Sequence, residues 1–197
     1  MRDKFIQIGS QPTYYSGLDD LSGKTEREKI EWFRGRFSKL VLTPLNEVRT
    51  IGNTNQLIFD LNLGVVTLIC TAIEALGSFY APQAPRDKTK FVSFVDEFMN
   101  PKYREKSSRT NQTYSEILYE KFRCGLAHGM SIEGHEVASR PEEYISDDNG
   151  YVSIDLWTLF EDMKQAFEAY IGRVASDDQT KANFFARFHG LFEKPYQ

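Results

Sequence analysis

Cysteine is scarce in this chain, since only Cys70 and Cys124 occur among its 197 residues. Both stand in apolar segments of helical periodicity, so we expect reduced thiols in a cytoplasmic protein rather than a disulfide scaffold. The opening residues contain no apolar run long enough for a secretory signal, which favours the same location.

Motifs for nucleotide, nucleophilic and metal chemistry are also missing. There is no Gly-x4-Gly-Lys-Ser/Thr phosphate loop, and the serines near the start do not stand in a nucleophile elbow. His128 and His135 lie seven residues apart, but a predicted helix end and Gly134 separate them, and no third ligand has metal-site spacing. We therefore expect neither a metal nor a cofactor.

An excess of positive charge is absent as well. Lysine and arginine number 24 against 28 aspartate and glutamate residues, which gives a net charge of −4. Charge alone therefore does not indicate a nucleic-acid-binding protein, and RNA binding would require a local basic cleft.

A single apolar run, residues 57–76, approaches the length of a membrane span. Asp60, Asn62 and Glu74 interrupt it, and it lacks flanking basic anchors. We interpret it as the central buried helix of a bundle and expect no membrane association.

The composition is that of a soluble globular protein, with 41% hydrophobic and 26% charged residues. Its length fits a single domain, which we place at residues 24–197, after an irregular arm at 1–23. Apolar residues recur at helical spacing through most of that domain, including an appended C-terminal helix at about 177–192. The pattern predicts an all-α helical bundle of about five to six helices.

Local signals mark where the helices begin and end. Thr25 and Glu28 form a capping-box pattern for the first helix, and Pro44 is expected to kink or end it. Asp155 and Asp177 are expected to cap the last two helices. The final helix is rich in phenylalanine, which fits either the core or a dimer surface.

A small β-hairpin is predicted between the helices, at about residues 132–154. Residues 135–138, 144–146 and 151–154 alternate in the manner of strands. Asp-Asp-Asn-Gly at 147–150 is a strong signal for a hairpin turn, because Asn-Gly tolerates positive φ.

The chain is organised around a helix expected at about residues 111–130. Arg123 and His128 stand late on this helix. Five positions would place them about 140° apart around an α-helix, where long side chains can still converge on one groove. Both lie off the core-facing stripe, which is formed by apolar residues every four positions: Tyr114, Leu118, Phe122 and Leu126.

The segment Arg123-Cys-Gly-Leu-Ala-His128, in a small helical protein, resembles the Arg-x4-6-His motif of the HEPN superfamily. The resemblance covers the motif directly and the helical layout of about residues 24 to 175 loosely. It implies a HEPN-like helical bundle that forms a homodimer, with the Arg and His of both copies facing one cleft. Many members of that family are metal-independent endoribonucleases, so the resemblance implies RNA cleavage through Arg123 and His128.

The reaction implied by this resemblance is attack of a ribose 2′-hydroxyl on the adjacent phosphate. His128 suits proton transfer because an imidazole titrates near neutral pH. Arg123 suits the phosphate because its planar, permanently charged fork can donate two parallel hydrogen bonds. Each chain supplies one such histidine, so the second proton transfer requires the other copy of a dimer.

Four further residues are candidates for this site, each with a plainer alternative. Glu74 either orients Arg123 or is an ordinary solvent-side or hydrogen-bonded carboxylate. Tyr119 either stacks a base or packs in the core. Lys102 and Arg104 belong to a local basic cluster around an aromatic residue, which is either an edge that tracks phosphates or a solvated linker.

Two functions stay open from the sequence. Arg123 and His128 favour a dimeric endoribonuclease of stress response or phage defence. Cys124, a candidate for contact with substrate, stands where many catalytic members carry a polar residue. It favours a non-catalytic helical dimer that binds RNA or a partner protein, such as a cognate antitoxin. In the plainest interpretation, Arg123 pairs with Glu120 and His128 is stabilised by the helix dipole.

Overall fold

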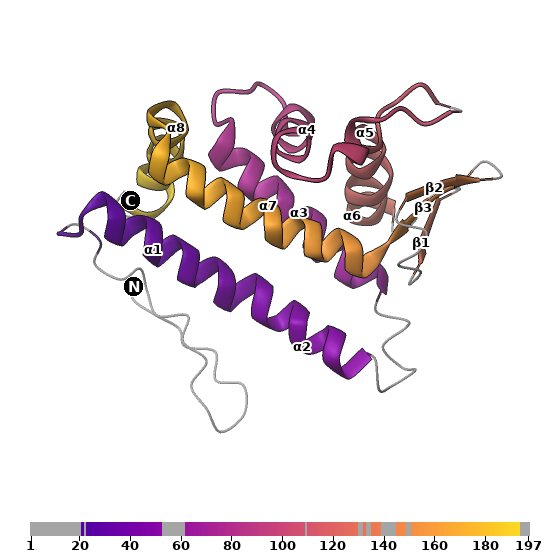
Figure 1. Cartoon of the computed structure of the whole chain (residues 1–197), viewed down its shortest axis with the longest axis horizontal. Helices are drawn as coiled ribbons and strands as arrows, with labels where there is room; N and C mark the ends of the chain where they lie inside the picture. Colours follow the sequence, from indigo (N-terminus) through magenta and orange to yellow (C-terminus); the bar gives the residue numbers. More distant parts are fainter. Residues whose placement is uncertain are drawn as a thin grey trace.

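The long apolar run forms α3 (Asn62–Tyr80), the helix against which most of the others pack. Figure 1 shows α3 behind α7 (Leu156–Ser176), with α4 (Asp87–Phe98) above and α8 (Asp178–Phe188) at one end. The inner side chains of α3 are fully buried, which confirms the prediction of a central core helix: Ile69, Ile73 and Leu76. By length and composition alone, α3 would also be apolar enough to cross a membrane.

The computed structural model describes residues 21, 23–52, 62–108, 110–129, 132, 135–138, 145–148 and 151–193. Helices dominate these residues, so the predicted all-α bundle is confirmed. Most of the predicted arm at 1–23 lies outside the described residues, as does the turn expected at 149–150.

One long helix runs along the outside of the bundle and passes through Pro44. It consists of α1 (Glu26–Phe37), a π-helical segment (Ser38–Leu42) and α2 (Thr43–Gly52). Pro44 therefore does not end the helix. The wide π-helical turn directly before it makes room for a residue that has no N–H and that crowds the preceding turn.

The predicted helix caps are confirmed. At the first helix, the Thr25 N–H donates to the Glu28 carboxylate over 2.8 Å, and the Glu28 N–H donates to the Thr25 hydroxyl over 3.3 Å. Asp155 accepts the Thr158 N–H over 2.7 Å at the start of α7, and Asp177 caps α8 in the same way. These carboxylates satisfy N–H groups that the first turn leaves without a partner.

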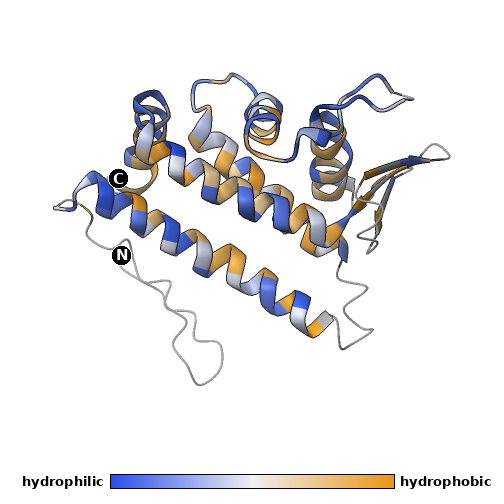
Figure 2. Cartoon of the chain, viewed as in Figure 1, coloured by the Kyte–Doolittle hydropathy of each residue, from blue (hydrophilic) through white to orange (hydrophobic). Residues whose placement is uncertain are grey.

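An aromatic cluster joins four helices in the core. The ring of Phe33 in α1 lies 4.7 Å from that of Phe79 in α3, 5.2 Å from that of Phe184 in α8, and 6.4 Å from that of Phe167 in α7. The sequence left open whether the final helix belongs to the core or to a dimer surface. Its phenylalanines are buried, so they belong to the core. Figure 2 shows polar and apolar residues alternating around α1 and α7, as expected for helices with one buried face.

The predicted hairpin is confirmed, and a third strand extends it. β2 (Ile145–Asp148) and β3 (Tyr151–Asp155) pair antiparallel. β1 (His135–Ala138) lies on the other side of β3 and runs parallel to it, with His135 opposite Val152. The small sheet closes the end of the bundle that is nearest to α6 (Gly125–Gly129) (Figure 1).

Candidate functional site

The motif helix consists of three consecutive segments. α5 (Tyr114–Ile117) is followed by a π-helical segment (Leu118–Cys124) and by α6. A second capping box, formed by Thr113 and Glu116, fixes its start. The predicted core stripe is confirmed, because all four of its residues are buried: Tyr114, Leu118, Phe122 and Leu126.

The π-helical segment changes the relation between Arg123 and His128. Arg123 lies in this segment and His128 in the α-helical turn that follows. A π-helix is bonded from i to i+5 and holds more residues in each turn than an α-helix. The separation of about 140° expected for an uninterrupted α-helix is therefore reduced. Such segments are rare and occur often at functional sites.

Arg123 is held by Glu74 of α3, from a position 49 residues away in the sequence. The Arg123 Nε donates to Glu74 Oε2, and Nη2 donates to Oε1 over 2.9 Å. The two side chains are only 25% and 18% exposed. Glu74 raises the pKa of Arg123, so the guanidinium stays charged. The predicted contact with Glu74 is confirmed, and the alternative pairing of Arg123 with Glu120 is wrong.

The pairing with Glu74 uses one edge of the Arg123 guanidinium and leaves a second edge available to another acceptor. Glu74 takes the edge formed by Nε and Nη2. Three of the five N–H donors of the group remain, and two of them point along the edge formed by Nη1 and Nη2. Nη1 donates to the Cys124 sulfur over 4.0 Å, a long hydrogen bond to a weak acceptor. Arg123 is thus oriented by a carboxylate and still able to donate two parallel hydrogen bonds to a second anion.

Tyr119 packs and also contacts Arg123. Its ring lies 5.3 Å from that of Phe91, and the Arg123 guanidinium lies 5.9 Å from its centre. Burial and the nearby Cys124 raise the pKa of Tyr119 to about 12, so the hydroxyl is neutral at physiological pH. The packing role foreseen for Tyr119 is therefore present, whereas base stacking remains a prediction.

Both cysteines lie near the ion pair and are free thiols. Cys70 stands one turn before Glu74 on α3 and is fully buried, and burial raises the pKa of its thiol above the usual range. Cys124 is half-buried and follows Arg123 directly. A protonated Cys70 adds no charge of its own beside the Arg123–Glu74 pair.

His128 is exposed in the last turn of α6. His128 is therefore accessible to solvent. Arg123 lies earlier on the same helix and is largely buried. The site combines a fixed cation with a solvent-exposed imidazole. That combination supplies one group suited to phosphate binding and one suited to proton transfer on the same helix.

Lys102 and Arg104 have partners elsewhere. They belong to a short 3-10 helix (Pro101–Arg104), in which Tyr103 is buried. Lys102 donates to Glu105 over 2.9 Å, and Arg104 donates to the backbone oxygen of Asp96. In the described residues Arg104 is thus tied to α4, whereas Lys102 also lies 5.9 Å from the ring centre of Tyr114 at the start of the motif helix. Their role in tracking phosphates stays a prediction.

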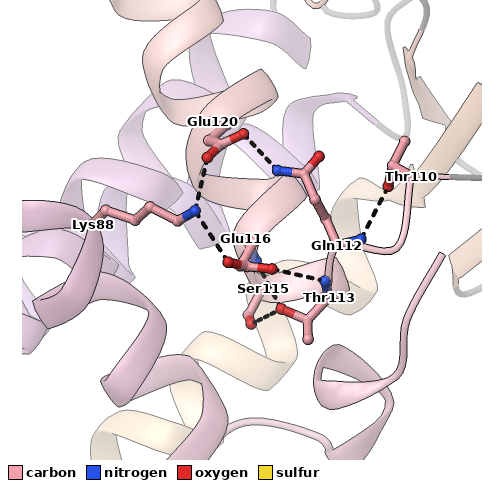
Figure 3. Close-up of polar contacts among 7 residues, drawn as sticks. All are labelled: Lys88, Thr110, Gln112, Thr113, Ser115, Glu116 and Glu120. Atoms are coloured by element: carbon pink, nitrogen blue, oxygen red, sulfur yellow. Dashed lines mark hydrogen bonds and ion pairs between the residues drawn. The ribbon is translucent and has the colours of Figure 1, made fainter.

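A network that the sequence did not reveal fixes the motif helix against α4 (Figure 3). The Lys88 Nζ lies 3.1 Å from a Glu116 oxygen and 2.7 Å from a Glu120 oxygen. Gln112 donates to the same Glu120 carboxylate over 2.6 Å. Two glutamates four positions apart repel each other on a helix, and Lys88 offsets that repulsion. Glu120 raises the pKa of Lys88, and Lys88 lowers that of Glu120.

His135 joins β1 to the end of the motif helix. Its Nδ1 accepts the Val152 N–H over 3.3 Å, and its ring lies 5.9 Å from that of Phe122. Burial lowers the pKa of His135, and the positive charge of Lys121 adds to the effect. Within the described ranges, no group of three or more His, Cys, Asp or Glu residues has the arrangement of a metal site.

This environment predicts a pH dependence of stability. The unfolded chain binds a proton at His135 near pH 6.5, before the folded protein does, because the folded pKa is lower. The contribution of His135 is thus complete above about pH 6.5 and declines as the pH falls below it. We expect the thermal midpoint to fall between pH 7.5 and pH 5.5, and to fall less in His135→Gln. An equal fall in both proteins would exclude His135 as the cause.

Comparison of the chain with protein-family models, with curated proteins and with solved structures finds no match.

Proposed function

We propose that this protein is a metal-independent endoribonuclease that acts as a cytoplasmic homodimer, with Arg123 and His128 of each copy at the reacting phosphate. The observation that carries this proposal is the Arg123–Glu74 pair. It fixes the guanidinium in advance and leaves one edge for a phosphate, and such preorganised charge is a main source of transition-state stabilisation.

In the proposed reaction, one His128 accepts the proton of the ribose 2′-hydroxyl, and the 2′-oxygen attacks the adjacent phosphorus. The bond between phosphorus and the 5′-oxygen breaks, and His128 of the partner subunit donates a proton to the leaving oxygen. Arg123 offsets the negative charge of the five-coordinate phosphorane. The products carry a 2′,3′-cyclic phosphate and a 5′-hydroxyl, and neither a metal nor a cofactor takes part.

The solvent face of α3 supports the dimer. Leu68 is 58% exposed and Leu63 is 40% exposed, both on this face. The hydroxyls of Thr67 and Thr71 donate to backbone oxygens of the preceding turn over 2.7 Å, so they do not require water. Glu74 continues the same face, and Arg123 neutralises it. A second copy can pack here without burying an unpaired charge, and a two-fold contact brings its Arg123 towards the first.

Leu68→Lys is expected to convert the dimer into a monomer, because it places a charge in the centre of an apolar contact. Leu191→Lys is a matched control, since Leu191 is 40% exposed on the π-helical segment His189–Glu193. Light scattering after size-exclusion chromatography measures both. A monomeric wild-type protein, or a dimeric Leu68→Lys variant, would contradict the assignment of this face.

RNA cleavage by the purified protein in the presence of EDTA tests the proposed function directly. We expect fragments that end in 2′,3′-cyclic phosphate and begin with a 5′-hydroxyl, on single-stranded or structured RNA. The proposal fails if chelation abolishes cleavage, or if neither kind of RNA is cut.

One observation favours a second function, a non-catalytic dimer that binds RNA or a partner protein. Glu74 already neutralises the charge of Arg123, and the net charge of the chain is −4. Both weaken the attraction of RNA, which counts against catalysis on RNA and, within this second function, favours a partner protein over RNA. Binding of RNA or of a co-purifying protein without any strand cleavage would identify this second function.

A further inference from the structure

A cavity of about 850 Å³ opens at the end of the bundle opposite to α6. It lies where the chain turns from α3 to α4 and where α7 meets α8 (Figure 1). Its volume falls in the range of about 300–1,000 Å³ that is typical of small-molecule sites. The proposed RNA site makes no use of it.

The charged residues in the lining of this cavity are Arg173 and Asp177, and each already has partners. Arg173 forms an ion pair with Glu97, and its guanidinium lies 4.8 Å from the centre of the Phe98 ring. Asp177 caps α8 by accepting the Thr180 N–H over 2.7 Å, and this bond holds the pKa of Asp177 below its usual range. Glu97 offsets the charge of Arg173, so this cation attracts phosphates and other anions less than an unpaired one would.

Two primary amides in the wall are held in one orientation. Asn183 Nδ2 donates to the backbone oxygen of Tyr80 over 3.0 Å, and Gln179 Nε2 donates to Asn183 Oδ1 over 3.2 Å. A backbone oxygen only accepts, so it fixes the Asn183 amide, which in turn fixes the Gln179 amide. Each amide retains one N–H and part of its acceptor capacity. The wall therefore offers donors and acceptors side by side.

Tyr80 adds an aromatic surface beside these amides. It is half-buried in the lining, and its ring packs edge-on against Phe98 at 5.1 Å and Tyr170 at 6.3 Å. Burial raises the pKa of Tyr80, which keeps its hydroxyl neutral. The lining contains one cation and one anion, Arg173 and Asp177, each of which has a partner within the protein. The rest of the lining is uncharged, with an aromatic ring on one side and amide donors and acceptors on the other.

We propose that this cavity binds an uncharged nucleobase or nucleoside, with the base edge on the amides of Gln179 and Asn183. A nucleobase is planar and neutral and carries donors and acceptors next to each other on one edge, which is the pattern that side-chain amides match with two hydrogen bonds. The proposal does not depend on the nuclease activity, because it concerns a different end of the molecule.

Isothermal titration calorimetry of the full chain tests this proposal. The ligands are adenosine, guanosine, cytidine and uridine, and their 5′-monophosphates. At least one nucleoside is expected to bind with a Kd below about 1 mM. Its monophosphate should bind no more tightly, because Glu97 offsets the charge of Arg173 and the ionised Asp177 repels a phosphate. Gln179→Leu should weaken binding about tenfold through the lost hydrogen bonds. Gln179 is exposed, so this variant is expected to fold.

Gln165→Leu serves as the matched control, since Gln165 is exposed on α7 outside the cavity lining. It should bind the nucleoside as the wild type does. The proposal is overturned if none of the four nucleosides binds in that range, or if a monophosphate binds more than about tenfold tighter than its nucleoside. It is overturned as well if Gln179→Leu binds normally or if Gln165→Leu loses as much affinity.

Discussion

Replacing His128 by alanine is expected to lower the rate of RNA cleavage by about 10²- to 10⁴-fold, the range typical of a lost general acid or base. His128 is exposed at the end of α6, so its removal should change the free energy of unfolding by less than about 0.5 kcal/mol. Cleavage rates and thermal unfolding of the same preparations separate these two effects.

His189→Ala is the control for His128→Ala. His189 is also exposed at the end of a helix, where it contacts Glu193, and no chemical role is assigned to it. It should leave the cleavage rate unchanged. A His128→Ala variant that cleaves at the wild-type rate would show that another group transfers the proton, and Arg123 alone would remain of the proposed pair.

Gly77→Ala is expected to destabilise the packing of the core strongly. A Cβ at this position would lie 2.5 Å from the backbone oxygen of Lys90 and 2.8 Å from its carbonyl carbon. Backbone atoms cannot rotate away, so α3 and α4 must move apart. We expect a loss of about 1–3 kcal/mol, which corresponds to a fall in the thermal midpoint of about 2–4 °C for each kcal/mol.

Gly172→Ala provides the comparison within another long helix. No atom lies within 4 Å of a Cβ placed at Gly172, in α7. Alanine there should stabilise the protein by up to about 1 kcal/mol, because it restricts the unfolded chain and favours the helix. If both variants melted at the same temperature, the close approach of α3 and α4 would not exist in solution.

Features that depend on neighbouring residues were predictable from the sequence. The caps at Thr25, Asp155 and Asp177 follow from a side chain and the N–H groups of the next turn, so a short segment contains the whole interaction. The core stripe of the motif helix follows from spacing alone. The hairpin of β2 and β3 follows from its turn residues.

Contacts between residues far apart in the sequence were predictable only where one of the residues lacked an obvious local partner. Glu74 is an acidic residue in an apolar helix, which indicated that its carboxylate needs a partner. Arg123 is that partner. Lys88 gave no such signal, because a lysine at the start of an ordinary helix needs no partner. The parallel pairing of β1 with β3 was not foreseen, since parallel register depends on a long connection that local patterns do not describe.

The π-helical segments were also not foreseen. Their extra residue in each turn follows from the packing of the whole helix and not from any local composition. For the motif helix this changes the angle between Arg123 and His128, and therefore the geometry of the candidate site. Apolar spacing identified which residues of that helix face the core, but it did not fix how far its last turns rotate.

The central claim is that one reacting phosphate requires His128 from two copies of the chain. Mixing wild-type protein with an equal amount of His128→Ala protein, after full exchange of subunits, tests it. About one quarter of the dimers would then contain two copies of His128. The account predicts that the mixture cleaves RNA at about one quarter of the rate of wild-type protein at the same total protein concentration. A remaining rate of about one half would contradict it, because each copy would then carry a complete site.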